Sequence, residues 1–320
     1  ATAFGVAASL GVGAAQINSG LHTVFGLPVG PTWQVGIIAV VTVLFVTSSV
    51  SGVARGVKLL SVGNLIAAAA LAGVVFVLGP TVHIIDTFTN SLGGYASEFV
   101  RMSLRLTPFR DSSWVGSWTI FYWAWWLAWS PFVGLFIARV SRGRTIREFV
   151  LGVVIAPTLV AFLWFSIFGG AALSLEIFQG APLADVAAKD SSLALFAMLQ
   201  QLPLATLTSI IGTLLVVVFF VTSGDSATLV LATMSHGGAD NPPHRSKIIW
   251  GVLIAGIAAA LLLAGGVQAV QTASIVFALP FTVVVVLMAV ALVRAIRADW
   301  EADQKRQRAL RRRMEQLVQP

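Results

Sequence analysis

The sequence contains no cysteine, and only 10% of its 320 residues are charged. Without cysteine the chain cannot be an extracellular domain held together by disulfide bonds. The sequence is 57% hydrophobic. Together with the small charged fraction, this excludes an intrinsically disordered chain and argues against a soluble globule. The mean hydropathy of +0.90 indicates that most of the chain lies in lipid.

The side-chain groups that soluble enzymes use are also scarce. With four histidines and no cysteine there are few ligands for a metal or haem, and the 29 glycines are scattered instead of forming a phosphate-binding loop. The net charge of +7 comes from basic residues between and after apolar runs, so no nucleic acid is expected as a partner. We therefore expect a membrane protein that is not an enzyme and has no cofactor.

A helix needs roughly 20 apolar residues to cross about 30 Å of hydrocarbon. Apolar stretches of this length recur along the chain. Eight such spans are predicted, at 3–19, 33–53, 61–79, 115–138, 148–170, 204–232, 248–265 and 268–292. Backbone polar groups must be satisfied inside lipid, so these spans are predicted to be helices. The fold class is all-α and polytopic, with a transmembrane domain over 1–293 and a basic tail over 294–320.

The basic residues predict the orientation, because Lys and Arg are retained on the cytoplasmic side of short loops. With residue 1 starting inside, 16 of the 20 basic residues lie on cytoplasmic segments, among them Arg55, Arg144, Lys247 and eight in the tail. Both termini are thus expected in the cytoplasm and the chain in the plasma membrane. The tail either binds anionic lipid headgroups or only fixes the topology and stays solvated.

Two further expectations concern the ends and the loops. Residues 88–107 mix apolar side chains with Glu98, Arg101 and Arg105, which predicts a helix lying along the outer membrane surface; an ordinary loop helix is the alternative. Residue 1 is an alanine close to the start of a hydrophobic span, so the sequence is expected to begin partway through a longer chain.

The strongest local signal is a cluster of aromatic residues, since six of the ten tryptophans lie between 114 and 129. Interfacial belts explain Trp114 and Trp118, but Trp129 lies about 16 Å deeper than Trp118 along a helix. At three-four spacing one stripe contains Trp118, Tyr122, Trp125, Trp129, Phe132 and Phe136, with Trp123 and Trp126 beside it. Pro131 is expected to kink this helix.

Such a cluster fits a ligand that is cationic and cannot donate hydrogen bonds. A methylated ammonium is held by cation-π attraction of about 0.5 to 2 kcal/mol per ring. The sequence therefore predicts a quaternary ammonium cargo, with simple core packing of the rings as the alternative.

The second signal is the run from Phe219 to Ser226, well inside an apolar span. Adjacent hydroxyls on Thr222 and Ser223 suit a sodium ion, which needs several oxygen ligands. The alternative is that both hydroxyls bond back to the preceding turn. Asp225 is an intramembrane carboxylate, which is costly enough to suggest a function: it orients the cation, pairs with a basic group of a neighbouring helix, or carries a proton.

These segments closely resemble the betaine/choline/carnitine transporter family, most of all its sodium-coupled glycine betaine carriers. The resemblance rests on the runs 116–136, 136–149 and 219–226, and extends to 16–21, 51–58 and 164–170. It implies twelve membrane helices, ten of them in two inverted five-helix repeats, and a homotrimer. The eight spans then correspond to the family's fifth to twelfth helices, and 88–107 to its amphipathic helix at the trimer contact.

The resemblance also implies roles for single residues. Trp126 is expected to face the trimethylammonium group, with Trp125 and Trp129 lining the outer and inner approaches. Phe132 links the substrate to a sodium site, and Phe136 belongs to the cytoplasmic gate. The predicted substrate-binding residues are Tyr122, Trp125, Trp126, Trp129, Phe132 and Phe136.

Half of the family's second sodium site is implied for the Phe219 carbonyl, Thr222 and Ser223, the other half lying on a helix before residue 1. No Lys or Arg precedes Arg55, whereas the family's carnitine exchangers place an arginine in the first of these spans, so ion coupling is favoured over exchange. The predicted function is sodium-driven symport of a quaternary ammonium osmolyte such as glycine betaine, by alternating access. The alternatives are a choline or carnitine carrier that uses protons or exchange, or a membrane osmosensor that does not transport.

Overall fold

The computed structural model describes residues 1–51, 54–107, 109, 113–239 and 241–318, apart from the side chains of 54–57, 139–140 and 311–318. The longer helices are α1 (Thr2–Phe25), α2 (Pro31–Ser51), α3 (Ala54–Leu78), α4 (Thr81–Ser103), α5 (Phe121–Val140), α6 (Ile146–Gln179), α9 (Ala205–Ser235) and α10 (His244–Val318). Shorter elements are the π-helical η1 (Val115–Ile120), α7 (Leu183–Lys189), η2 (Ser191–Leu193) and α8 (Ala194–Leu199). The described residues contain no strand, which confirms the all-α prediction.

Six helices in the described residues are long and apolar enough to cross a membrane. They are α2, the Lys58–Leu78 part of α3, η1 together with α5, α6, α9 and α10. These helices cover seven of the eight predicted spans, because the last two lie in one helix, α10. Residues 52–53, at the end of the predicted span 33–53, lie outside the described residues.

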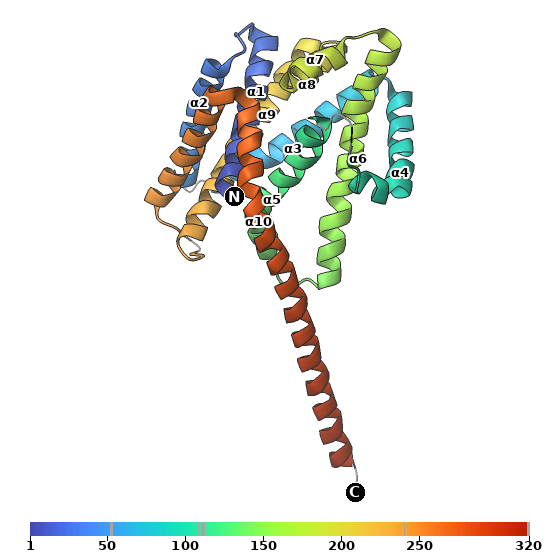
Figure 1. Cartoon of the computed structure of the whole chain (residues 1–320), viewed down its shortest axis with the longest axis vertical. Coiled ribbons are helices and arrows are strands. Elements are labelled where there is room, and N and C mark those ends of the chain that lie inside the picture. Colours follow the sequence, from blue (N-terminus) through green and yellow to red (C-terminus); the bar gives the residue numbers. More distant parts are fainter. Residues whose placement is uncertain (52–53, 108, 110–112, 240, 319–320) are drawn as a thin grey trace.

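The two predicted spans in α10 are separated by a break in the backbone. Gly265 and Gly266 have non-helical dihedral angles, and Gly266 has a φ of 64°, in the region that favours glycine. Figure 1 shows α10 turning back at the top of the bundle. The break therefore lies at the residues where the sequence separates the two apolar runs.

The eighth predicted span, 3–19, lies in α1, which is not among the six apolar helices. α1 is rich in glycine and alanine and is buried among α2, α5, α9 and α10. A Cβ added at Gly5 would lie 2.7 Å from the Ala128 Cβ on α5, and one added at Gly13 would lie 2.5 Å from the Phe220 ring on α9. Small residues let membrane helices pack closely, so the low hydropathy of α1 reflects its central place.

The predicted surface helix 88–107 is corrected by the structure to α4, Thr81–Ser103. It begins earlier because Pro80 starts the helix and the Thr81 hydroxyl donates to the Phe76 carbonyl at 2.7 Å. α4 lies along α6, with Ile84 buried in the contact (Figure 1). Its position relative to the membrane surface remains a prediction.

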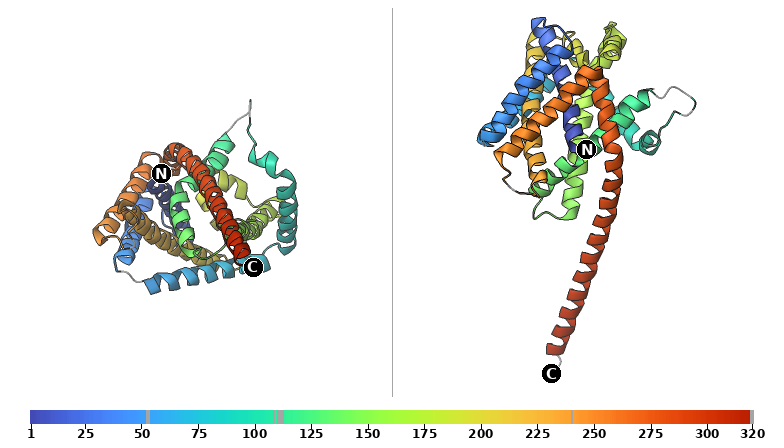
Figure 2. Two further views of the ribbon diagram at one scale, coloured as in Figure 1. Left: turned by 90° about the horizontal axis from the view of Figure 1, so that it is seen from below. Right: turned by 60° about the vertical axis from the view of Figure 1, so that its left-hand side comes forward.

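The predicted boundary between membrane domain and tail, at 293 and 294, coincides with no break in the helix. α10 continues to Val318 and extends well beyond the bundle, as the right-hand view of Figure 2 shows. The residues beyond 293 are mainly Ala, Glu, Gln, Lys and Arg, which favour helix. Residues 319–320 of the predicted tail lie outside the described residues.

Candidate functional site

The helix that carries the aromatic run continues through Pro131 to Val140. Proline has no N–H, so the Leu127 carbonyl loses its usual helical donor. The Ser130 hydroxyl donates to this carbonyl at 2.7 Å instead. The carbonyl that Pro131 deprives of its helical donor is thus already hydrogen-bonded.

One face of α5 is fixed to α1 through indole hydrogen bonds. Trp125 Nε1 donates to Ser9 Oγ at 2.9 Å, and Trp129 Nε1 lies 3.0 Å from Ser9 Oγ and 3.1 Å from the Gly5 carbonyl. Both rings and Phe132 are partly buried against the core around α1. Sequence analysis missed Ser9, because no local pattern connects it to residues more than a hundred positions away.

Trp126 lies on a different face of α5, and its side chain is 72% exposed. It lines a cavity of about 450 Å³ between α4, α5 and α6, together with the aromatic side chains of Tyr95, Phe162 and Phe165. Tyr95 and Phe162 meet edge to face, with their ring centroids 5.1 Å apart. The remaining lining residues are Thr87, Ser91, Pro157, Thr158, Ala161 and Ser166. A cavity of this size is typical of small-molecule sites, and the open indole face suits a cation.

The structure therefore divides the predicted substrate-binding residues between two faces. Trp125, Trp129 and Phe132 pack toward α1, whereas Trp126 faces the cavity. Along α5 the rings of Tyr122 and Trp125 meet edge to face at 5.7 Å, and those of Trp129 and Phe132 at 5.1 Å. Phe136 is exposed near the far end of the helix.

The predicted sodium ligands lie in a regular stretch of α9. The Thr222 hydroxyl is 2.9 Å from the Val218 carbonyl and 3.1 Å from that of Phe219, which is the back-bonding that the sequence left open as the alternative. Ser223 is partly buried. The Thr222 hydroxyl oxygen keeps lone pairs that a cation could use, whereas the Phe219 carbonyl accepts the helical N–H of Ser223 and is also contacted by the Thr222 hydroxyl.

Asp225 faces a basic residue of a neighbouring helix, one of the three roles that the sequence left open. Its carboxylate lies in the field of the Lys247 ammonium and near Ser49. Lys247, which the sequence placed in a cytoplasmic loop, is part of α10 and only 6% exposed. Sequence analysis missed it as a functional candidate because it borders an apolar run.

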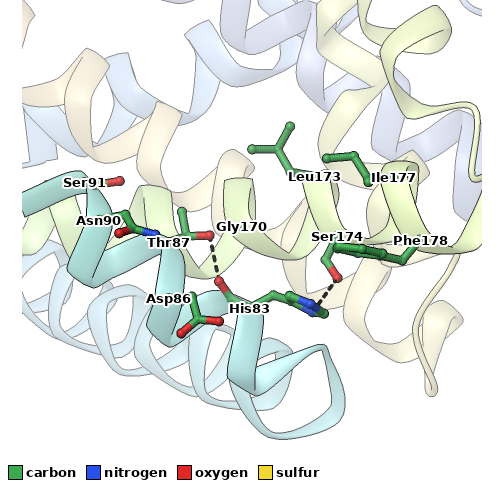
Figure 3. Close-up of a pocket in the computed structure, with 10 residues that line it drawn as sticks. All are labelled: His83, Asp86, Thr87, Asn90, Ser91, Gly170, Leu173, Ser174, Ile177 and Phe178. Carbon is green, nitrogen blue, oxygen red and sulfur yellow. Dashed lines mark hydrogen bonds between the residues drawn. The ribbon is translucent and has the colours of Figure 1, made fainter. Parts of the chain in front are cut away.

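A second cavity, of about 420 Å³, lies between α4 and α6 (Figure 3). The His83 ring stacks on Phe178 and is hydrogen-bonded to Ser174, with Nδ1 and Oγ 3.0 Å apart. Thr87 and Ser91 line both cavities, which therefore adjoin. Among the described residues no group of three or more His, Asp or Glu side chains is placed to hold a metal ion.

Comparison with known proteins gives consistent matches over nearly the whole chain. Residues 1–301 match the family described as BCCT, betaine/carnitine/choline family transporter. The chain is 48% identical over 298 residues to the glycine betaine transporter OpuD of Bacillus subtilis, covering 92% of this chain and 58% of that protein. It is 46% identical over 308 residues to the ectoine/hydroxyectoine transporter of Virgibacillus pantothenticus, covering 96% and 62%.

A glycine betaine/proline/choline transporter of Vibrio parahaemolyticus is 43% identical over 298 residues, covering 92% of this chain and 53% of that protein. The chain thus spans 53 to 62% of the length of these three relatives.

Proposed function

The chain belongs to the betaine/carnitine/choline transporter family, and on this premise we propose that it takes part in secondary transport of glycine betaine into the cell with sodium. The observation that carries the proposal is Trp126, whose exposed ring lines an aromatic cavity. The family and the named relatives are transporters and not enzymes. The substrate, the coupling ion and the plasma-membrane location are all part of the proposal.

The substrate class follows from the chemistry of the cavity. A trimethylammonium group carries a charge but no N–H, so aromatic faces bind it better than hydrogen-bond acceptors do. Trp126 supplies such a face, and Tyr95, Phe162 and Phe165 provide further rings around the same space. The indole N–H groups of Trp125 and Trp129 are bonded to α1, so these two residues act by placing α5 beside it.

Sodium is proposed as the driving ion, bound by the Phe219 carbonyl, Thr222 and Ser223. Oxygen ligands of this kind suit a hard cation, and α1 contains no Lys or Arg that would replace it. In alternating access α5 and α1 would change their contact, and the hydrogen bonds at Ser9 are few enough to exchange partners. A homotrimer and anionic lipids at the basic end of α10 complete the proposed assembly.

The test is uptake of radiolabelled glycine betaine into proteoliposomes by the full-length protein, with external sodium replaced by potassium. We expect uptake to require sodium and Trp126→Ala to raise KM about tenfold, the loss of one cation-π contact of ~1.4 kcal/mol. Trp126→Phe should recover part of the affinity. Sodium-independent uptake, or wild-type affinity in Trp126→Ala, would contradict the proposal.

Thr222→Ala tests the cation site, and Thr282→Ala is its matched control. The Thr282 hydroxyl on α10 also bonds back to a helical carbonyl, that of Ala278 at 3.0 Å. Both substitutions remove the same group from an apolar helix, but only the first removes a proposed ligand. We expect a rise of tenfold or more in the half-saturating sodium concentration for Thr222→Ala and less than a twofold change for Thr282→Ala.

Ectoine is the second substrate candidate, favoured by the 46% identity to a relative named for ectoine and hydroxyectoine. Unlabelled ectoine in excess over labelled glycine betaine separates the two. Stronger inhibition by ectoine than by unlabelled glycine betaine would assign the cavity to ectoine.

A further inference from the structure

Three helices meet around Ser49 on α2, Asp225 on α9 and Lys247 on α10. Ser49 and Lys247 are 7% and 6% exposed. The Lys247 ammonium donates to the Ser49 backbone carbonyl at 3.2 Å. Asp225 lies near Ser49 and in the field of Lys247. A buried lysine that is bonded to Ser49 and the intramembrane carboxylate thus lie on adjoining helices.

An apolar layer one helical turn away fixes this junction. Phe45, four residues before Ser49, is fully buried. A Cβ added at Gly224, next to Asp225, would lie 2.6 Å from the Phe45 ring. A Cβ added at Gly251, four residues after Lys247, would lie 2.5 Å from Val46 and 3.2 Å from Phe45. The close packing holds the three helices, and with them the three polar residues, in one arrangement.

The ammonium is held by two sources of negative charge. The Ser49 carbonyl, in the last turn of α2, accepts the hydrogen bond of the ammonium through the partial negative charge of its oxygen. Asp225 supplies the second. Within the described residues the ion pair with a nitrogen to oxygen distance below 4 Å joins Glu98 and Arg101, so Lys247 and Asp225 interact at longer range. Asp225 therefore keeps part of its attraction for another cation.

The same turn of α9 carries the proposed sodium ligands. Thr222 precedes Asp225 by three residues and therefore lies beside it on the helix surface. A sodium ion bound at Thr222 and Ser223 would lie in the field of Asp225 as well as in that of Lys247. Since buried charges are screened little, the ammonium acts on the ion through the protein interior.

We propose that Lys247 is a tethered counter-ion that sets the sodium affinity of the α9 site. It offsets part of the attraction of Asp225, so the ion binds weakly enough to be released in each transport cycle. Lys247 is thus a positioning residue and contributes no ligand. This inference rests on the proposed sodium coupling.

Substitutions of the two charges should shift sodium affinity in opposite directions. Lys247→Gln removes the opposing charge, and we expect the half-saturating sodium concentration to fall about tenfold, the effect of a unit charge on the order of 10 Å away at an effective dielectric constant near 20. Asp225→Asn should raise it by a similar factor. The double variant Asp225→Asn/Lys247→Gln should lie within about threefold of wild type, because the two effects cancel.

The experiment measures initial glycine betaine uptake against sodium concentration with the full-length protein in proteoliposomes, at constant ionic strength. A second readout, independent of transport, is the rise in unfolding temperature that sodium produces over potassium in detergent, which reports binding directly. Lys247→Arg keeps the charge and should behave like wild type. Arg245→Gln removes an exposed cation from the same turn of α10 and should change sodium affinity less than twofold.

Opposite shifts in the single variants, with cancellation in the double variant, would support the proposal. If both single variants shift the sodium affinity in the same direction, or if Lys247→Gln does not shift it, the proposal is overturned, while sodium coupling itself is unaffected. If Lys247→Gln does not fold, the double variant decides: sodium affinity more than tenfold from wild type contradicts the proposal. If neither the uptake nor the stability of the wild-type protein depends on sodium, both the proposed function and this inference are contradicted.

Discussion

Two faces of the same helix place tryptophan in opposite surroundings. On one face of α5, Trp125 and Trp129 are partly buried and donate their N–H groups to Ser9 and Gly5 of α1. On the other, Trp126 is 72% exposed and lines the cavity with α4 and α6. The first face holds two helices together, and the second leaves an aromatic ring free for a ligand.

An aromatic stripe can therefore combine structure and recognition within a single helical turn. An indole whose N–H is satisfied by a neighbouring helix is expected to matter for stability, because its removal leaves a space and unpaired acceptors. An exposed indole that lines the cavity is expected to matter for binding alone.

The largest effect is expected for Trp129→Ala. The substitution removes a partly buried ring and both of its N–H contacts, so the free energy of unfolding should fall by about 3 kcal/mol. Trp126→Ala should change it by less than about 0.5 kcal/mol, as for most exposed side chains. Unfolding of both variants in detergent, followed by circular dichroism, makes the comparison. Equal losses would show that the two faces do not differ in their structural role.

The next effect concerns the close approach of α1 and α5 at Gly5. A Cβ there would lie 2.7 Å from that of Ala128, so Gly5→Val should force the helices apart and cost about 2 kcal/mol. Gly134→Val on α5 is the matched control, because its added Cβ would have no described atom within 4 Å apart from its chain neighbours and the backbone of its own helix. The yield of folded protein and its thermal unfolding report both. A Gly5→Val protein as stable as Gly134→Val would show that the contact can relax.

A smaller effect is expected for Ser9→Ala. The Trp125 N–H loses its hydroxyl acceptor, while that of Trp129 keeps the Gly5 carbonyl. One hydrogen bond of this kind contributes about 1 kcal/mol. Ser97→Ala, which removes an exposed hydroxyl bonded to its own helix, should cost less. Thermal unfolding checks the difference, and a stability equal to wild type would indicate that α1 holds α5 by packing alone.

The helices were predictable because their signal is local. Runs such as 33–53 and 204–232 are apolar throughout, and the glycine pair at 265 and 266 marks the break in α10. The limits of the helix around 88–107 were wrong because its first turn depends on Pro80 and on a hydrogen bond to Phe76. The sequence contains no local signal for the end of the membrane domain near residue 293, because α10 continues as a helix beyond the bundle.

The candidate site was predictable only in part. The composition of 114–129 pointed to α5, but which tryptophan faces α1 depends on Ser9, 116 positions from Trp125. Tyr95, Phe162 and Phe165 lie on two other helices, and no spacing rule in the sequence predicts that they lie near Trp126. In the sequence Lys247 resembles a loop residue, because its contact with Ser49 joins residues 198 positions apart. These contacts are tertiary, so local patterns cannot contain them.

The smallest effect is expected for Trp123→Ala, which isolates the cavity from exposure alone. Trp123 is 63% exposed and lies three residues before Trp126 on the same helix, but it is not among the cavity-lining residues. If binding requires the cavity, its removal should change the KM for glycine betaine less than twofold, against about tenfold for Trp126→Ala. Initial uptake rates of both variants in proteoliposomes make the measurement. An equal rise in KM would mean that a broad indole surface, and not the cavity, recognises the substrate.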